Sequence, residues 1–209
     1  MIQTIVRYMQ NKLDAETIFQ RNYGLTELIE RDGRVFPLFY ETDGKYKLDF
    51  QPNKWFGVSY FRKNGNVSFA DGNFPSLKPC EVPVTVTVPL KFICSIKKAK
   101  LKCDDNYAGD DLAFYIAKLF EDINGLRTEL NAKRATFVVG EYSTDSQKVL
   151  DSEFSGMDAI FKPEYVYLSM DIEINVQTTK ECMFDYCGGV IIDEDADKVV
   201  DSRNNKLRA

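Results

Sequence analysis

Two stretches of the chain alternate apolar and polar residues over an unusual length. Every second residue is apolar in residues 84–96, and the same alternation returns in residues 166–176. Successive side chains of a β-strand point to opposite faces, so this period predicts two strands that each have one buried face. The first stretch would reach roughly 40 Å at about 3.3 Å per residue, whereas a typical strand has about 5–6 residues. We expect strands of this length to leave part of their surface for a partner to cover.

Helical spacing marks two longer segments on either side of the first predicted strand. Apolar residues recur every three or four positions in residues 2–19 and in residues 107–130, which predicts two amphipathic helices. We expect Gly24 to cap the first helix in a left-handed conformation, and Gly125 to end or kink the second.

Two shorter elements are predicted between the second helix and the second long strand. Residues 135–142 are apolar at their centre and predict a strand, and residues 145–154 predict a short helix. Its N-cap would be Ser143, Thr144 or Asp145.

Residues 25–81 have a different pattern, with short apolar runs separated by turn signals. Asp32-Gly33 and Asn64-Gly65 stand between such runs, and both pairs favour the type I′ turn of a β-hairpin. The first long strand contains Pro89, which has no N–H to give to a ladder, so a bulge or a free edge is predicted there. The segment is interpreted as a meander of short strands.

The elements together predict an α+β fold. We expect a mostly antiparallel sheet with two long strands, helices packed on one face, and a β-hairpin-rich insertion. The predicted core domain consists of residues 1–24 and 82–180, with residues 25–81 as a hairpin subdomain or arm. Residues 181–209 form a C-terminal extension, whose polar part from residue 193 is expected to be disordered alone or ordered by a neighbour.

Composition argues against most catalytic and metal chemistry. The chain of 209 residues contains no histidine, which removes the commonest general base and the commonest transition-metal ligand. Cys182 and Cys187 are spaced like some metal ligands, but no second pair completes a site. We therefore expect no catalytic residue, no cofactor and no metal site, and a protein that is not an enzyme.

Charge and hydropathy limit the other classes of partner. The net charge of −5 argues against dedicated nucleic-acid binding, which needs clustered cations. The basic residues between 97 and 102 are interpreted as a solvated strand end. No apolar run approaches the roughly 20 residues needed to span a bilayer, and the first residues lack a signal peptide. These features predict synthesis in a cytosol and no membrane contact.

Two groups of residues are candidates for contact with a partner. Aromatic residues are enriched at interface cores, and Trp55 and Phe56 are the favoured pair within residues 25–81, although aromatic residues there also serve a core. Phe184 and Tyr186 form an apolar island in the C-terminal extension and are further candidates for a subunit interface.

The polar face of the second long strand carries Ser169, Asp171 and Glu173. The simpler interpretation is that these residues face solvent and have no further role. If the two long strands are neighbours, Lys91 and Lys97 are possible cross-strand partners of the carboxylates.

The order of these elements resembles virion proteins of tailed bacteriophages that infect Bacteroidetes, of the kind that build the head-to-tail connector or the tail. It is also similar to the tail-terminator architecture, in which a sheet packs helices on one face and subunits close into a ring. The stretches that carry the resemblance are residues 5–8, residues 26–33 with Pro37, residues 57–63, Pro89-Leu90 and residues 165–176.

The resemblance implies a non-enzymatic ring subunit in a virion, made in the bacterial cytoplasm. Its partners would be copies of itself and other connector or tail proteins. Ser169, Asp171 and Glu173 would line a lumen through which DNA passes without specific binding. Two alternatives stay open: a soluble monomeric adaptor or inhibitor with a hairpin arm, and an enzyme that works without histidine.

Overall fold

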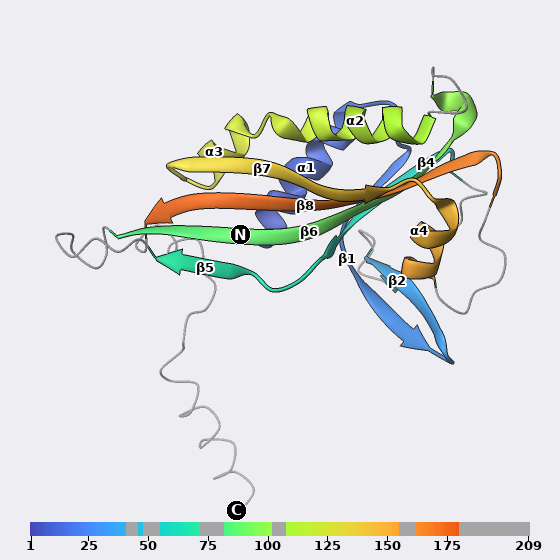
Figure 1. The fold of residues 1–209 in the computed structure, drawn as a ribbon, viewed down its shortest axis with the longest axis horizontal. Helices are drawn as coiled ribbons and strands as arrows, with labels where there is room; N and C mark the ends of the chain where they lie inside the picture. Colours follow the sequence, from blue (N-terminus) through green and yellow to red (C-terminus); the bar gives the residue numbers. More distant parts are fainter. Residues whose placement is uncertain (41–45, 48–54, 72–81, 102–107, 155–161, 180–209) are drawn as a thin grey trace, which may run out of the picture.

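The computed structural model describes residues 1–40, 46–47, 55–71, 82–101, 108–154 and 162–179. Within this part, a mixed sheet of eight strands carries four α-helices (Figure 1). The helices are α1 (Ile2–Ala15), α2 (Ala108–Glu121), α3 (Asn124–Glu129) and α4 (Ser146–Glu153), with a 3-10 helix, η2, at Lys98–Lys100. The strands are β1 (Arg21–Arg31), β2 (Arg34–Tyr40), β3 (Tyr46–Lys47), β4 (Gly57–Lys63), β5 (Ser68–Asp71), β6 (Pro83–Lys97), β7 (Arg134–Ser143) and β8 (Tyr165–Thr179). The predicted α+β class with a mostly antiparallel sheet is confirmed.

The two long strands lie side by side at the centre of the sheet. The strand order is β3-β2-β1-β4-β6-β8-β7. β5 lies outside this order and pairs with a different part of β6 than β4 does. β6 and β8 pair antiparallel without a register shift, from Pro83 opposite Thr179 to Lys97 opposite Tyr165. Only the pairing of β1 with β4 is parallel among the described strands. Both strands predicted from the alternation are therefore present, and each is longer than the alternation alone indicated.

One face of the sheet is buried beneath α1, α2 and α3. It takes every second residue of β6 from Val84 to Ile96 and of β8 from Val166 to Val176, all 7 % exposed or less. The aromatic rings of Phe61, Phe92 and Phe120 meet there with centroids 5.3 to 5.9 Å apart. Burying a large apolar side chain contributes about 1.5–3 kcal/mol. Burial of the alternating residues therefore contributes much of the free energy that holds these helices on the sheet.

The opposite face is covered differently along its length. At one end α4 packs on it, and its core contains Tyr60, Ile93, Val149, Leu150, Phe154, Tyr165 and Tyr167. The predicted packing of helices on one face thus holds for α1 to α3, while α4 lies on the other. Towards the far end of β6 and β8 this face carries Thr85, Thr87, Lys91, Asp171, Glu173, Asn175 and Gln177, and no described helix packs over it (Figure 1).

Pro89 stands where the neighbour of β6 changes. β4 pairs with β6 as far as Leu90, and β5 begins its pairing at Thr87. The Pro89 carbonyl accepts a hydrogen bond from the N–H of Asn64, 3.2 Å away. The N and C=O of one strand residue point to the same side, so the missing donor of Pro89 faces the gap between β4 and β5. The predicted local free edge is confirmed.

The two predicted hairpins have different outcomes. Asp32 and Gly33 join β1 to β2 with φ values of 54° and 71°, as a type I′ turn requires, and this hairpin projects away from the main sheet in Figure 1. The hairpin predicted at Asn64-Gly65 is wrong. Among these two residues only Gly65 has positive φ, and β4 and β5 both pair with β6 instead of with each other.

The first helix ends earlier than Gly24 predicted. α1 ends at Ala15, and Gly24 lies inside β1. Contacts between α1 and β1 explain the difference, because the side chain of Gln10 donates to the Asn22 carbonyl at 2.6 Å and the Asn22 amide donates to Asp14 at 2.6 Å. Residues just after the helix are thereby held as a strand beside it.

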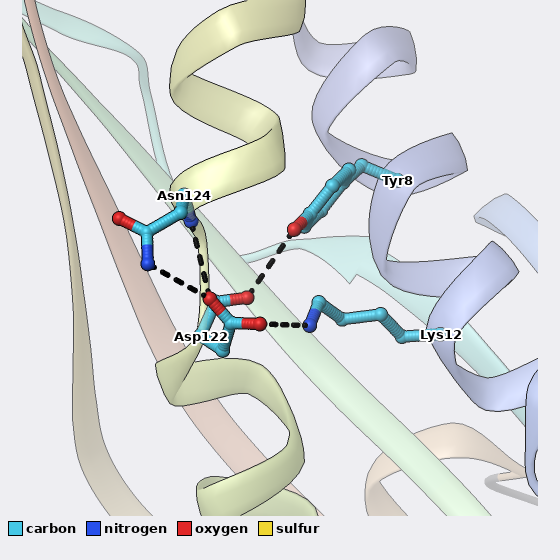
Figure 2. A network of polar contacts seen from close by, with 4 residues as sticks. All are labelled: Tyr8, Lys12, Asp122 and Asn124. Atoms are coloured by element: carbon cyan, nitrogen blue, oxygen red, sulfur yellow. Dashed lines mark hydrogen bonds and ion pairs between the residues drawn. The ribbon is translucent and has the colours of Figure 1, made fainter.

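The second predicted helix is interrupted at residues 122–123, between α2 and α3, and not at Gly125. Figure 2 shows the cause. Asp122 accepts hydrogen bonds from the backbone N–H and the side-chain amide of Asn124, at 3.4 and 3.1 Å. Its carboxylate also pairs with Lys12 of α1 at 3.3 Å, and its carbonyl accepts from the Tyr8 hydroxyl at 3.3 Å. The Asn124 backbone N–H, followed by Lys12, lowers the pKa of Asp122.

The remaining expectations for the elements hold. β7 and α4 lie where a strand and a short helix were predicted. Asp145 caps α4 by accepting from the backbone N–H groups of Gln147 and Lys148.

The division into a core domain and a subdomain of residues 25–81 stays a prediction. β4 and β5 of that segment belong to the same sheet as β6 and β8. The C-terminal extension lies outside the described residues.

Candidate interaction site

Trp55 and Phe56 lie at the end of the sheet where β4 begins, and their backbone is fixed from three directions. The Phe56 N–H donates to the side-chain oxygen of Gln20 at 3.1 Å. The Phe56 carbonyl accepts from the N–H of Lys97 at 2.7 Å, and the Trp55 carbonyl accepts from the Tyr165 hydroxyl at 3.0 Å. The predicted interface pair therefore stands on a firmly held segment, and both side chains are half-buried.

A cation lies over each of three aromatic rings at this end of the sheet. The distances from cation to ring centroid are 4.6 Å for Arg21 over Trp55, 4.7 Å for Lys100 over Phe56 and 5.7 Å for Lys97 over Tyr165. We call these residues the aromatic–cation cluster: Arg21, Trp55, Phe56, Lys97, Lys100 and Tyr165. Each such contact stabilises by about 0.5–1 kcal/mol at exposed sites. The basic stretch interpreted as a solvated strand end thus contributes two of its lysines to ordered contacts.

The composition of the aromatic–cation cluster is typical of a protein interface. Trp, Tyr and Arg dominate the energetic centres of interfaces, and aromatic residues are enriched in interface cores. The cluster carries three positive charges, on Arg21, Lys97 and Lys100. The other two residues predicted for a subunit interface, Phe184 and Tyr186, lie outside the described residues.

The three residues predicted to line a lumen share the face opposite α1 to α3, but their exposure differs. Ser169 is only 9 % exposed and lies between Ile93 and Ser143 of the neighbouring strands. Asp171 is partly exposed, and Glu173 is exposed and accepts a hydrogen bond from the Asn175 amide at 2.9 Å. That these residues line a lumen stays a prediction, with Asp171 and Glu173 as the two that reach the surface.

One of the two predicted cross-strand pairs is present. Lys91 lies directly opposite Asp171, and its ammonium group is 3.4 Å from the carboxylate. Lys97 instead lies opposite Tyr165 and contacts its ring. Because Lys91 neutralises Asp171, the acidic character of this surface comes mainly from Glu173.

A buried polar network beneath α4 was not predicted from the sequence. The Glu153 side chain is fully buried. One carboxylate oxygen is 2.9 Å from the guanidinium of Arg62 and 3.3 Å from the Ser152 hydroxyl. The other oxygen accepts from the Tyr60 hydroxyl at 3.1 Å. A signal existed, because Glu153 follows Val149 by four residues and so lies on the apolar face of a short helix.

Burial is the main cause of the altered acidity in this network. It raises the pKa of Glu153, and the positive charge of Arg62 and the Tyr60 hydrogen bond act in the opposite direction. Burial, together with the nearby Glu153 carboxylate, raises the pKa of Tyr60 well above 10. Perturbed acidity often marks function, but these groups bind one another and hold α4 to β4. We therefore assign the network to the stability of the fold.

Within the described residues, no group of three or more Cys, Asp or Glu side chains is placed to hold a metal ion. No described helix is both long and apolar enough to cross a membrane. A comparison with models of known protein families finds no match, and neither does a comparison with curated proteins. Function is therefore inferred from the fold and the surfaces described above.

Proposed function

We propose that this protein is a non-enzymatic structural subunit of a phage virion, which forms a ring in the head-to-tail connector or the tail with DNA passing through its lumen. The observation that carries the proposal is the central pair of β6 and β8. These strands pair along all 15 residues of each, with three helices on one face and a polar surface over part of the other. A sheet of this kind is suited to form one segment of a ring wall that neighbouring copies of the chain would extend.

A closed ring needs two different surface patches that meet on neighbouring copies. The aromatic–cation cluster supports one of them, because three hydrogen bonds hold the backbone of Trp55 and Phe56 and its side chains are of the types that stabilise interfaces. Assembly through this patch would bury Trp55 and Phe56 further and would place the three cations against acidic groups of a neighbour.

The polar face supports the role of a lumen wall. Asp171 is neutralised by Lys91 at 3.4 Å, and Glu173 is exposed. A wall of this kind has no excess of cations to hold phosphate groups, so DNA would pass without being bound.

Electron microscopy of the purified protein, together with light scattering over a range of concentrations, tests the proposal. We expect ring-shaped particles with a central opening and a mass that is a whole multiple of the subunit. A monomer at every concentration would contradict assembly of a ring by this chain alone.

The second candidate is a monomeric adaptor or inhibitor, and the projecting β1–β2 hairpin favours it. This hairpin leaves the main sheet after Thr26, the last residue of β1 that pairs with β4. Such an arm suits insertion into a partner. The light-scattering measurement separates the two candidates, because the adaptor would stay monomeric.

A further inference from the structure

An apolar groove of about 400 Å³ lies between the first turn of α1 and the strands β5 and β6. Its lining residues are Met1, Ile2, Gln3, Leu25, Lys63, Val67, Phe69, Val86 and Val88. Phe69 is 60 % exposed, although a large aromatic ring is normally placed where it can be buried. The groove therefore presents apolar surface that an additional segment would cover.

The groove lies close to the point where the chain leaves the sheet. Val86 in the groove is opposite Val176 of β8, and β8 ends three residues later at Thr179. Three residues of a strand correspond to roughly 10 Å. β5 and β8 also end at the same end of the sheet in Figure 1.

We propose that residues 182–192, which follow β8, dock in this groove of their own chain. This segment contains Phe184, Tyr186 and the run Val190-Ile191-Ile192. Phe184 is five residues beyond Thr179, a distance that an extended chain spans with up to about 17 Å. The tether is therefore long enough to bring the first aromatic ring to the groove and too short to allow it far beyond.

Two properties favour this occupant over a separate molecule. A short tether gives the segment an effective concentration on the order of millimolar at the groove, which a free partner reaches only when it is abundant. The charge also fits, because Lys63 lines the groove, while residues 181–197 contain six carboxylates and no cation. Docking covers Phe69 and gives the apolar residues of the extension a place to be buried.

Cross-linking within one molecule tests this docking in the full chain. The test protein carries Phe69→Cys together with Cys80→Ser and Cys103→Ser, so that the reactive thiols are the one introduced at position 69 in the groove and the native Cys182 and Cys187. Cys94 is 1 % exposed and does not react. A short bismaleimide is added, and the product is separated by size and mapped by mass spectrometry.

The matched control replaces Phe69→Cys by Arg134→Cys in the same background. Arg134 is exposed and lies opposite Gln177 on the strand next to β8, so it is nearer to Thr179 than Phe69 is. An extension without a preferred site would therefore cross-link to position 134 at least as fast as to position 69.

We expect a cross-linked monomer that joins position 69 to Cys182 or Cys187, formed faster than the control product. Adding Phe184→Ser and Tyr186→Ser should abolish this preference, whereas Val199→Ser and Val200→Ser, an apolar pair further along, should leave it unchanged. Equal rates at positions 69 and 134 would overturn the proposal. Cross-linked dimers through position 69 would overturn it too, since the groove would then hold a second copy. The proposed ring contact at the aromatic–cation cluster is tested separately, whereas docking within the chain would take Phe184 and Tyr186 away from the subunit interface predicted for them.

Discussion

Glu153 is an acidic residue in a buried environment, which disfavours the charged form of its carboxylate. Its side chain is fully buried. The carboxylate pairs with Arg62 and accepts hydrogen bonds from Tyr60 and Ser152. Removing one partner of a buried ion pair leaves an uncompensated charge, which typically costs more than the intact pair contributes. The network links α4 to β4, so loss of Arg62 or Tyr60 should destabilise the packing of α4 on the sheet.

The raised pKa of Glu153 predicts a pH dependence of stability. Its pKa in the folded protein lies above the ordinary value of 4.5, so between these two values the folded state binds more protons than the unfolded state. The free energy of unfolding contributed by this group is thus greatest below pH 4.5 and is lost as pH rises through the folded pKa. Glu153→Gln removes this contribution. Denaturant unfolding of both proteins from pH 4 to 8 should show the wild type losing stability relative to the variant as pH rises.

The control for this experiment is Glu173→Gln, because Glu173 is exposed on the sheet. Its stability should follow that of the wild type across the whole pH range. A constant difference between Glu153→Gln and the wild type would contradict the assignment of the raised pKa to Glu153.

Contacts between single residues could be predicted when both residues belonged to regular strand patterns. Contacts between residues of unrelated elements could not. The Lys91–Asp171 pair could be predicted because both residues lie on the polar faces of two strands that were expected to be neighbours. The partners of Glu153 could not, because no repeating pattern relates a residue of α4 to Tyr60 of β4, 93 residues earlier in the chain. Only the packing of α4 on the sheet brings them together.

Among the elements, the β1–β2 hairpin depends most directly on single residues. Gly33 has φ of 71°, and a Cβ atom built there meets no atom within 4 Å. Gly33→Ala therefore changes only the backbone preference, and we expect it to destabilise the hairpin by about 1 kcal/mol. Hydrogen exchange of the paired residues 27–38 measures the change.

Gly33→Asn is the matched variant, because asparagine tolerates the left-handed region better than alanine. It should accelerate exchange less than Gly33→Ala does. Equal exchange in all three proteins would show that the turn does not limit the opening of the hairpin.

Periodicity predicted which elements exist, and local contacts decided where they end. α1, β6 and β8 lie where helical spacing or period two placed them, and β7 and α4 lie where an apolar centre and a capping residue predicted them. Gly24 and Gly125 were expected to end helices, but neither does. The side chains of Gln10, Asp14 and Asn22 fix the start of β1, and Asp122 with Asn124 fixes the break before α3. Side-chain hydrogen bonds of this kind leave no periodic signal.

For the whole molecule, the aromatic–cation cluster predicts where assembly is sensitive to mutation. Trp55→Ala with Phe56→Ala removes both rings at the proposed contact. Alanine substitution at the centre of an interface typically costs about 2 kcal/mol or more, so the double variant should be mostly monomeric under conditions in which the wild type assembles. Light scattering measures the change, and circular dichroism checks that the fold is retained.

Phe114→Ala is the control for this prediction. Phe114 is 68 % exposed on α2 and is not one of the residues of the aromatic–cation cluster, so its removal should leave assembly unchanged. If the double variant assembles as the wild type does while keeping its fold, the cluster is not the contact between subunits.

The arrangement of layers could be predicted only in part. One strong alternating face on each long strand was enough to place α1 to α3 on the same side of the sheet. The docking of α4 on the other side was not foreseen, because the apolar patch it covers consists of only a few residues, including Tyr60, Ile93, Tyr165 and Tyr167. They interrupt an otherwise polar face, and the interruption is visible only when three strands are aligned.

Pro89 has a consequence for how the sheet comes apart. The ladders that β4 and β5 form with β6 stop on either side of it, and no interstrand bond from its nitrogen connects them. We therefore expect thermal fraying that starts at Asp71 to end at Thr87 and to leave the ladder from Leu90 to Ile96 closed. β5 should then be able to separate from β6 while β4 stays paired with it.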